Sequence, residues 1–355
     1  MRPVRFILAT LSSLLPALTY AQTTGELEEF NAAYLQYGNA VDSNPVVARD
    51  AAKRALDFGR SLFGEENERT AMLAINYANL LEGEQAQAYL DEAVTIYQTK
   101  FGVATEEMIL PYMRLGRMLT NNSKYELALD YYQKARVLAE NHLGIDSIVA
   151  GNIQLELGSI EFSREQDEAA LSYLAAAQQA LQGESEIAAL NNFARVNLLF
   201  GRIYLHQERY QMALDNLLVS LDALSAYPNS DIRLSNRLYL IEAYEKLGRS
   251  AQATEHLLAI GAVNRLAPDE NLTPLYLVVP DFGATEGVPD DESGILVSFT
   301  VDKEGFVRDP VLMSSVASDS LSAIFLQAIG QFRFAPRFIA GEPVDSPSQQ
   351  YRFRY

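Results

Sequence analysis

Residues 112–135 read YMRLGRMLTNNSKYELALDYYQKA, and they show the pattern from which the fold of the chain can be predicted. Apolar residues recur every three or four positions on both sides of a short polar turn, which predicts two amphipathic helices joined by a tight connection. Ala128 and Ala135 fall where the two helices must approach closely, because small side chains permit that approach. The stretch is therefore predicted to be a helical hairpin.

Similar blocks precede and follow this hairpin, and each ends in an apolar or amide residue followed by glycine. These endings are Phe63-Gly64, Phe101-Gly102, Leu143-Gly144 and Gln182-Gly183. They lie roughly 40 residues apart, a period typical of stacked helix pairs. Glycine at these positions predicts the end of the second helix of each pair. One helix pair cannot bury its apolar face alone, so we expect a continuous helical repeat over residues 27–266.

The blocks resemble the tetratricopeptide family. The residues that carry this resemblance are Tyr112, Leu115-Gly116, Leu119, Ala128, Tyr132 and Ala135, with further copies at Phe200-Gly201, Tyr244 with Gly248, Leu157-Gly158 and Ala74 with Tyr77, and a degenerate first copy from Phe30 to Phe63. The resemblance implies a solenoid whose concave face, here called the repeat groove, binds a protein partner. The groove residues it implies are Asn79, Arg117, Asn121, Asn152, Ser159, Arg195, Arg202, His206 and Glu242. Arginines there would hold a peptide carboxylate in bidentate geometry; solvated arginines or ion pairs within one helix are the alternative.

The helical period stops after Pro268, and residues 267–293 are predicted to be a linker ending in Asp290-Asp291-Glu292. Residues 294–301 and 306–313 are predicted strands joined by a tight turn at Gly305. A helix capped by Ser318 and a final strand of alternating aromatic and basic residues complete a small domain over residues 294–355. The chain is therefore predicted to be an α+β multidomain protein.

This C-terminal part resembles, from about residue 272, the C-terminal domain of the TonB family of periplasmic energy transducers. The matching motifs are Phe299-Thr300-Val301-Asp302 with Gly305, Phe332-Arg333-Phe334 with Pro336, Gly341-Glu342-Pro343-Val344 and Tyr351-Arg352-Phe353. The resemblance implies a small antiparallel sheet with one helix, whose last strand adds an extended peptide such as the box segment of a TonB-dependent outer-membrane receptor. The residues of this peptide-pairing strand are Gln349, Gln350, Tyr351, Arg352, Phe353, Arg354 and Tyr355. The alternative is an ordinary terminal strand whose charged side chains prevent pairing with another chain.

The N-terminus is typical of an export signal. Arg2 and Arg5 precede an apolar stretch, and Thr19-Tyr20-Ala21 provides small residues before a cleavage site. We expect a signal peptide at residues 1–21, cleaved after Ala21, and a periplasmic protein. An uncleaved anchor in the inner membrane is the alternative.

Charge and composition exclude several classes of function. With 46 acidic and 28 basic side chains the net charge is −18, which argues against nucleic acid as the partner. The chain has no cysteine, and its three histidines never lie at the spacing of metal ligands. No phosphate-binding loop or nucleophile motif is present, so we expect no enzyme, no cofactor and no metal site.

These observations predict a periplasmic adaptor that binds proteins or peptides. The alternatives are a divergent membrane-anchored energy transducer for outer-membrane transport, and a cell-envelope assembly scaffold that forms a homodimer through its C-terminal domain.

Overall fold

The computed structural model describes residues 22–41, 43–228, 230–263, 271–281, 294–313 and 319–353. The chain separates into two compact units, Met1–Ala180 and Leu181–Tyr355, which are described separately. The predicted signal peptide, most of the predicted linker, and Ser318, Arg354 and Tyr355 lie outside the described residues.

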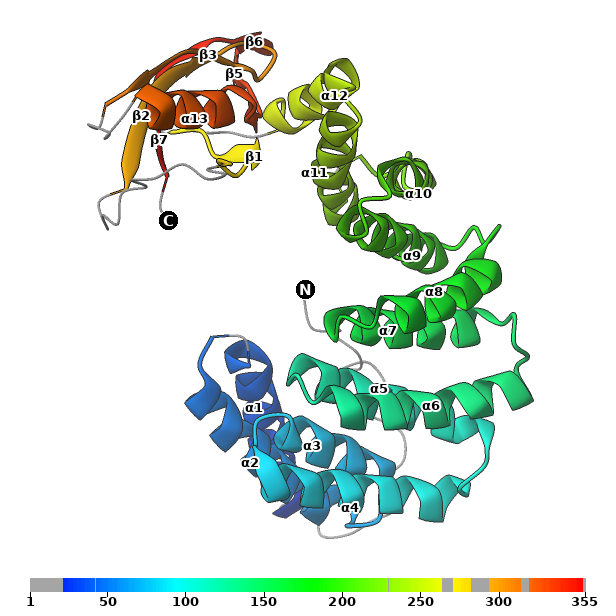
Figure 1. Cartoon of the computed structure of the whole chain (residues 1–355). Helices are drawn as coiled ribbons and strands as arrows, with labels where there is room; N and C mark the ends of the chain where they lie inside the picture. Colours follow the sequence, from blue (N-terminus) through cyan, green and yellow to red (C-terminus); the bar gives the residue numbers. More distant parts are fainter. Residues whose placement is uncertain are drawn as a thin grey trace. The chain divides into compact units, whose positions relative to one another are not determined.

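The first unit is built from helices that pair in chain order (Figure 1). They are α1 (Gln22–Ala40), α2 (Pro45–Phe63), α3 (Glu68–Ala78), α4 (Gly83–Phe101), the short 3-10 helix η1 (Glu106–Met108), α5 (Ile109–Asn121), α6 (Tyr125–His142), α7 (Ile148–Ser163) and α8 (Asp167–Leu181). The pairs α1 with α2, α3 with α4, and α5 with α6 each form a hairpin. The degenerate first copy of the repeat therefore folds like the others.

Local signals start and stop these helices. Asn44 caps α2, because its side chain accepts a hydrogen bond of 3.2 Å from the Val47 N–H, and Pro45 follows at the first helical position. Gly64 ends the same helix with φ of 92°, a conformation that favours glycine.

Close approach between paired helices explains the glycine inside the first helix of a pair. A Cβ atom on Gly116 of α5 would lie 2.7 Å from the ring of Tyr132 on α6. The paired helices can therefore reach this separation only with glycine at that position. A single apolar core runs through the unit from Phe30 to Ile160.

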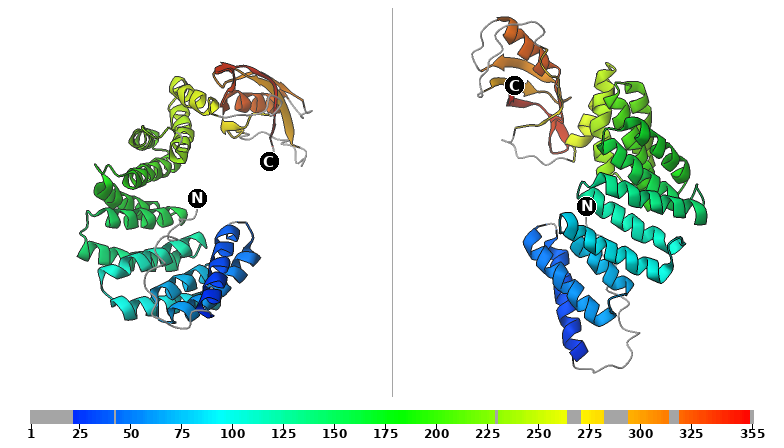
Figure 2. Two further views of the ribbon diagram at one scale, coloured as in Figure 1. Left: turned by 180° about the vertical axis from the view of Figure 1, so that it is seen from behind. Right: turned by 60° about the horizontal axis from the view of Figure 1, so that its bottom comes forward.

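The second unit continues with two helix pairs, α9 (Ile187–His206) with α10 (Tyr210–Ala223) and α11 (Asp231–Lys246) with α12 (Ser250–Gly261). A small sheet region follows them, seen from two further directions in Figure 2. Its elements are β1 (Pro274–Tyr276), β2 (Ile295–Val301), β3 (Val307–Leu312), α13 (Asp319–Gly330), β4 (Arg333–Phe334), β5 (Arg337–Ile339), β6 (Glu342–Val344) and β7 (Ser346–Phe353).

The main sheet is antiparallel, with strand order β3-β2-β7. Val297 and Phe299 of β2 point into a core that also contains Phe325 of α13 and Phe353 of β7. The Phe325 and Phe353 rings lie 5.2 Å apart, so α13 covers this face of the sheet. The chain therefore combines a helical-repeat solenoid fold with a small C-terminal antiparallel sheet.

The structure corrects the predicted linker and adds strands. Residues 274–276, placed in the linker, form β1 and pair with β4. β4 and the β5–β6 hairpin were not predicted as separate strands. Strands of two or three residues are too short to show a periodic pattern, and β1 is defined only by its distant pairing partner.

The sheet region packs against the last helix pair of its own unit. Arg333 of β4 is 2% exposed and donates hydrogen bonds to Glu245 on α11 and to Thr254 Oγ1 on α12, the latter at 2.6 Å. Its guanidinium carbon lies 3.7 Å from the centre of the Phe306 ring. A Cβ atom on Gly261 of α12 would lie 2.4 Å from the Pro336 carbonyl oxygen. The last helix pair and the sheet region therefore share buried contacts.

Candidate functional site

The predicted groove residues all lie on the first helix of a pair or at its end. The first unit holds Asn79 at the end of α3, Arg117 and Asn121 on α5, and Asn152 and Ser159 on α7; the second holds Arg195, Arg202 and His206 on α9 and Glu242 on α11. The structure thus places the predicted residues in two sets, one for each unit.

In the first unit, some of these side chains already serve the fold. Asn79 accepts a hydrogen bond of 2.9 Å from the Asn122 side chain at the end of α5. The Ser159 hydroxyl donates to the carbonyl of Leu155 one turn earlier, at 2.8 Å. Arg117 and Asn121 are exposed, so they are the members of this set that present their polar groups most fully to solvent.

In the second unit, the groove arginines make contacts within and between helices. Arg195 donates to Asn192 on the same helix at 3.3 Å. The Arg202 guanidinium carbon lies 5.4 Å from the centre of the Tyr239 ring on α11, a cation–π contact. These contacts orient both side chains within their own unit.

Glu242 lies beside the sheet region. Burial raises its pKa above the ordinary value, opposed by the charge of Lys246. The pKa of Tyr276 on β1 is also raised, first by burial and then by the charges of Glu245 and Glu242. β1 therefore lies close to the α11 face that carries Glu242, and this face is only partly accessible to a partner.

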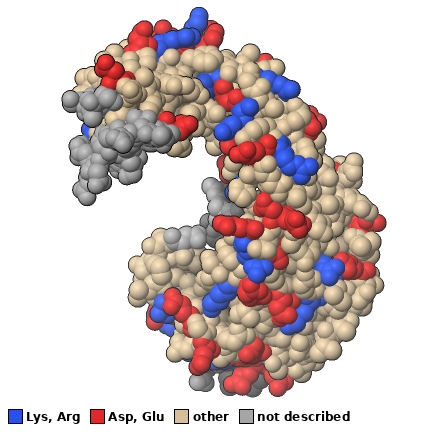
Figure 3. All heavy atoms as spheres, in the orientation of Figure 1, with Lys and Arg blue, Asp and Glu red and all other residues tan. Residues whose placement is uncertain are grey.

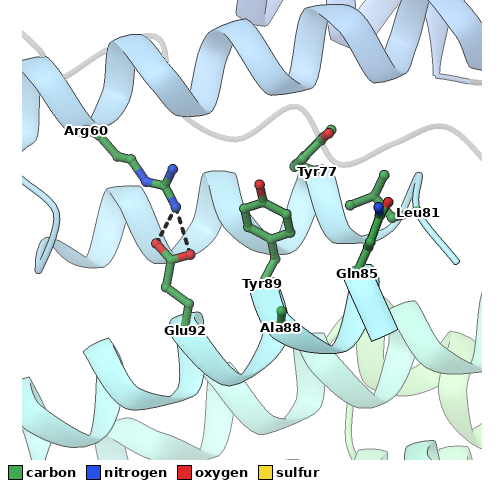
Figure 4. A pocket seen from close by; sticks show the side chains of 7 residues that line it. All are labelled: Arg60, Tyr77, Leu81, Gln85, Ala88, Tyr89 and Glu92. Atoms are coloured by element: carbon green, nitrogen blue, oxygen red, sulfur yellow. Dashed lines mark hydrogen bonds and ion pairs between the residues drawn. The ribbon is translucent and has the colours of Figure 1, made fainter. Parts of the chain in front are cut away.

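A pocket of about 470 Å³ lies in the first unit between α2 and α4 (Figure 4). Its lining residues are Arg60, Tyr77, Leu81, Gln85, Ala88, Tyr89 and Glu92. Arg60 donates to both carboxylate oxygens of Glu92, at 2.6 and 2.7 Å. Burial alone would lower the pKa of Arg60, but the hydrogen bond and charge of Glu92 raise it. The charges of this pocket thus compensate each other, and its remaining polar groups are phenol hydroxyls and an amide.

None of the groove predictions included this pocket. Tyr77 was recognised only as a repeat position, and the ion pair joins residues from successive repeats. The tyrosine rings of Tyr77 and Tyr89 meet edge to face with centres 4.9 Å apart. The sequence indicates this contact only through the positions of the two tyrosines on the first and second helix of one pair.

The predicted peptide-pairing strand corresponds to β7, one of the two outer strands of the main sheet. Gln350 and Arg352 are exposed. Phe353 is buried in the core opposite Ile295 of β2. Gln349 is also buried, and its side chain accepts a hydrogen bond of 2.7 Å from the Leu272 N–H. Two of the predicted pairing residues thus have side chains that hold the domain together.

Along β7, the main-chain N–H and C=O groups of successive residues point alternately toward β2 and away from it. The Leu296 carbonyl accepts a hydrogen bond from Met313, so the main-chain groups of Leu296 face β3. Those of Val297, the next residue, then face its β7 partner Tyr351. By the same alternation, the N–H and C=O of Gln350 face away from β2.

A β-bulge ends this regular stretch. Val301 pairs with Ser346 and Phe299 with Gln349, so β7 has one extra residue between these pairs. Ser348 has φ of 58°, and the neighbouring Pro347 has no N–H to donate. The stretch of regular strand from Gln349 to Phe353 is called the β7 edge below.

Three general features complete the description of the chain. Among its residues, no group of three or more histidine, aspartate or glutamate side chains is placed to hold a metal ion. No described helix has both the length and the apolar character required to cross a membrane. On the face shown in Figure 3, basic and acidic side chains are interspersed.

The chain matches no protein-family model and no curated protein. Among solved structures, BtubC from P. vanneervenii is similar over 72% of this chain and 99% of its own, with 14% identity and a TM-score of 0.46. A Podosopora anserina putative kinesin light chain with nearly identical TPR-like repeats is similar over 55% of this chain and 94% of its own, with 18% identity and a TM-score of 0.42. A signal-transduction ATPase with a tetratricopeptide repeat sensor from Pyrococcus horikoshii is similar over 68% of this chain and 40% of its own, with 17% identity and a TM-score of 0.39. These similarities concern the helical-repeat fold alone.

Proposed function

We propose that this chain is an exported protein-binding adaptor whose C-terminal sheet adds an extended peptide along the β7 edge. The observation that carries the proposal is the outer position of β7, with the main-chain groups of Gln350 directed away from β2. An extended peptide would continue the sheet by hydrogen bonding to such groups. The TonB-like motifs around Phe299, Phe332 and Gly341 support a receptor box segment as the peptide.

The geometry limits the length and favours an acidic character of the bound peptide. The bulge at Pro347 and Ser348 interrupts regular pairing, so the added strand would be short. Arg352 is exposed on this strand, and its charge would attract an acidic peptide during encounter. Affinity would come mainly from the main chain, and charge would govern selectivity.

The helical repeats would bind a second protein. Stacked helix pairs offer extended surfaces with side chains at regular intervals, and Arg117 and Asn121 present polar groups on α5. In this proposal the chain brings a partner of the repeats close to the protein whose peptide occupies the β7 edge.

The substitution Gln350→Pro tests strand addition. Gln350→Pro removes an N–H that faces away from β2, so the pairing of β2 with β7 is retained. Gln350→Ala is the matched control, because it removes the same side chain and keeps the N–H. Phe353→Pro is unsuitable, since Phe353 belongs to the core.

Binding of the full chain to synthetic receptor-box peptides would be measured by fluorescence anisotropy. We expect Gln350→Ala to bind like the wild-type chain and Gln350→Pro to bind about tenfold more weakly. Equal binding by all three chains would refute strand addition at this edge. A concentration-dependent dimer that Gln350→Pro abolishes would instead indicate that the edge pairs two copies of the chain.

Export is tested by the mature N-terminus. Mass spectrometry of protein from periplasmic and membrane fractions should find a start at Gln22 in the periplasm. An intact Met1 in the membrane fraction would favour the membrane-anchored transducer instead.

A further inference from the structure

The seam where α10, α11 and α12 meet holds a group of basic side chains for which the described part of the chain provides no acidic partner. Arg233 and Arg237 lie one turn apart on α11. Arg237 Nη1 donates a hydrogen bond of 3.0 Å to His256 Nδ1 on α12, and Arg233 Nη1 donates one of 2.8 Å to the Leu221 carbonyl on α10. These three residues, Arg233, Arg237 and His256, are called the basic cluster.

The cluster differs from several other packed arginines of this acidic chain, which bind carboxylates. Five partly or fully buried arginines each bind a carboxylate: Arg54, Arg60, Arg136, Arg164 and Arg333. Arg233 and Arg237 are also partly buried, yet in the described part of the chain their hydrogen bonds go to a carbonyl and an imidazole only. Among the described residues, these two neighbouring positive charges therefore have no counter-charge within ion-pair distance.

The surroundings of the cluster make this arrangement costly. Burial lowers the pKa of Arg237, and the charge of Arg233 lowers it further. His256 accepts from Arg237 through Nδ1, so its ring is neutral and contributes no negative charge to balance the two arginines. Arg233 Nε is buried and has no acceptor. An anion placed against the two guanidinium groups would offset both the repulsion and the loss of hydration.

The location is distinct from both surfaces described above. Arg233 precedes Glu242 by nine residues, which places it on the opposite side of α11 from that groove residue. The β7 edge belongs to the sheet region, in which Arg333 contacts α11 at Glu245, near the other end of the helix. The cluster is therefore independent of strand addition.

We propose that Arg233 and Arg237 bind an oxyanion, a carboxylate or phosphate group, in the seam between α10 and α12, with His256 holding Arg237 in position. Guanidinium groups match both oxyanions because each presents two parallel N–H donors. A carboxylate would come from a partner protein or a small acid, and a phosphate from a phosphorylated ligand.

Thermal unfolding of the full chain tests the proposal with inorganic phosphate as the probe, against sodium chloride of equal ionic strength. We expect phosphate to raise the midpoint of the second unit by roughly 3 °C at a concentration ten times its Kd, with saturation. Arg233→Gln and Arg237→Gln should lose this increment. Arg249→Gln, which removes an exposed arginine before α12, is the matched control and should keep it. The control also accounts for the general stabilisation that phosphate gives to folded proteins.

A second measurement needs no variant. Phosphate should shift the Nε–Hε resonances of Arg233 and Arg237 saturably in the wild-type chain, and acetate should do the same if carboxylates are also ligands. A response to phosphate alone supports a phosphorylated ligand. Equal responses of all four chains in the unfolding experiment, or unchanged arginine resonances with both anions, would overturn the proposal.

Discussion

A single buried side chain, His256, makes the stability of the second unit depend on pH. Its ring is 7% exposed and stacks on Tyr244 with centres 5.6 Å apart. Burial, and then the charge of Arg237, lower its pKa from 6.5 to about 4. Between these values the unfolded chain takes up a proton that the folded chain does not. The contribution of His256 to the free energy of unfolding is therefore fully present above pH 6.5 and is lost as the pH falls toward 4.

The prediction is that His256→Gln weakens this dependence on acid. Glutamine still offers an oxygen to Arg237 but does not titrate. Between pH 7 and pH 4.5 the free energy of unfolding should fall by about 2 kcal/mol less in the variant than in the wild type. Urea denaturation at both pH values measures the difference. An acid dependence of His256→Gln identical to that of the wild type would contradict the assignment.

Paired helices depend on glycine where they approach most closely. Gly116 faces the Tyr132 ring, and Gly201 faces Leu217, where an added Cβ would lie 2.5 Å away. Gly116→Ala should destabilise the first unit by about 1–3 kcal/mol, because the ring or the helix must shift. Urea denaturation followed by circular dichroism would measure this loss.

The control for this prediction is Gly38→Ala on α1. An added Cβ at Gly38 would contact nothing within 4 Å, so the substitution should stabilise the chain by about 0.5–1 kcal/mol through a less flexible unfolded state. If both substitutions had the same effect, the α5–α6 contact would not require glycine.

At the scale of elements, much of the architecture could be predicted. The four glycine endings at 64, 102, 144 and 183 all adopt positive φ in the structure. β2 begins one residue later than the predicted strand and ends at the predicted residue, and β3 is one residue shorter than predicted at each end. These features depend on nearest neighbours in the chain. β1 and β4 escaped prediction because each is defined by the other, and neither is long enough to show alternation.

The candidate surfaces were less predictable. The predicted groove residues lie on the first helix of a pair or at its end, and only the structure shows that Asn79 and Ser159 are already hydrogen-bonded. Gln349 was predicted as a pairing residue, and only the structure shows that its side chain is buried and hydrogen-bonded to the Leu272 N–H. The pocket beside Arg60 and the basic cluster were not predicted, since both combine residues from successive helix pairs.

On the scale of the molecule, the second unit joins two helix pairs to the sheet region. Arg333 is central to this contact, because its partners come from α11, α12 and the turn before β3. Burial lowers its pKa, and the charge of Glu245 opposes that effect. Glu245 itself also accepts a hydrogen bond from Ser250, at 2.6 Å.

Arg333→Met should therefore loosen the sheet region and the last helix pair together. Removing one partner of a buried ion pair leaves the other charge uncompensated, at a cost of about 3–5 kcal/mol. Hydrogen exchange should accelerate in α12 and in β4 of the same unit, while α3 to α6 stay as in the wild type. Arg308→Met removes an exposed partner of Asp302 and should cost less than about 1 kcal/mol. Acceleration confined to β4 would show that Arg333 does not link the two parts.

The helix pairs, their order, and the change from helical repeats to a small sheet could all be predicted from the sequence. Periodicity, caps and glycines act between residues a few positions apart, so they can be read directly from the chain. Which charges are compensated, and which strand lies at the outside of the sheet, became visible only in the folded structure. Arg333 and Glu245 lie 88 positions apart, and Leu272 and Gln349 lie 77 apart. Such pairings depend on how the packed elements meet, and residue spacing does not encode that.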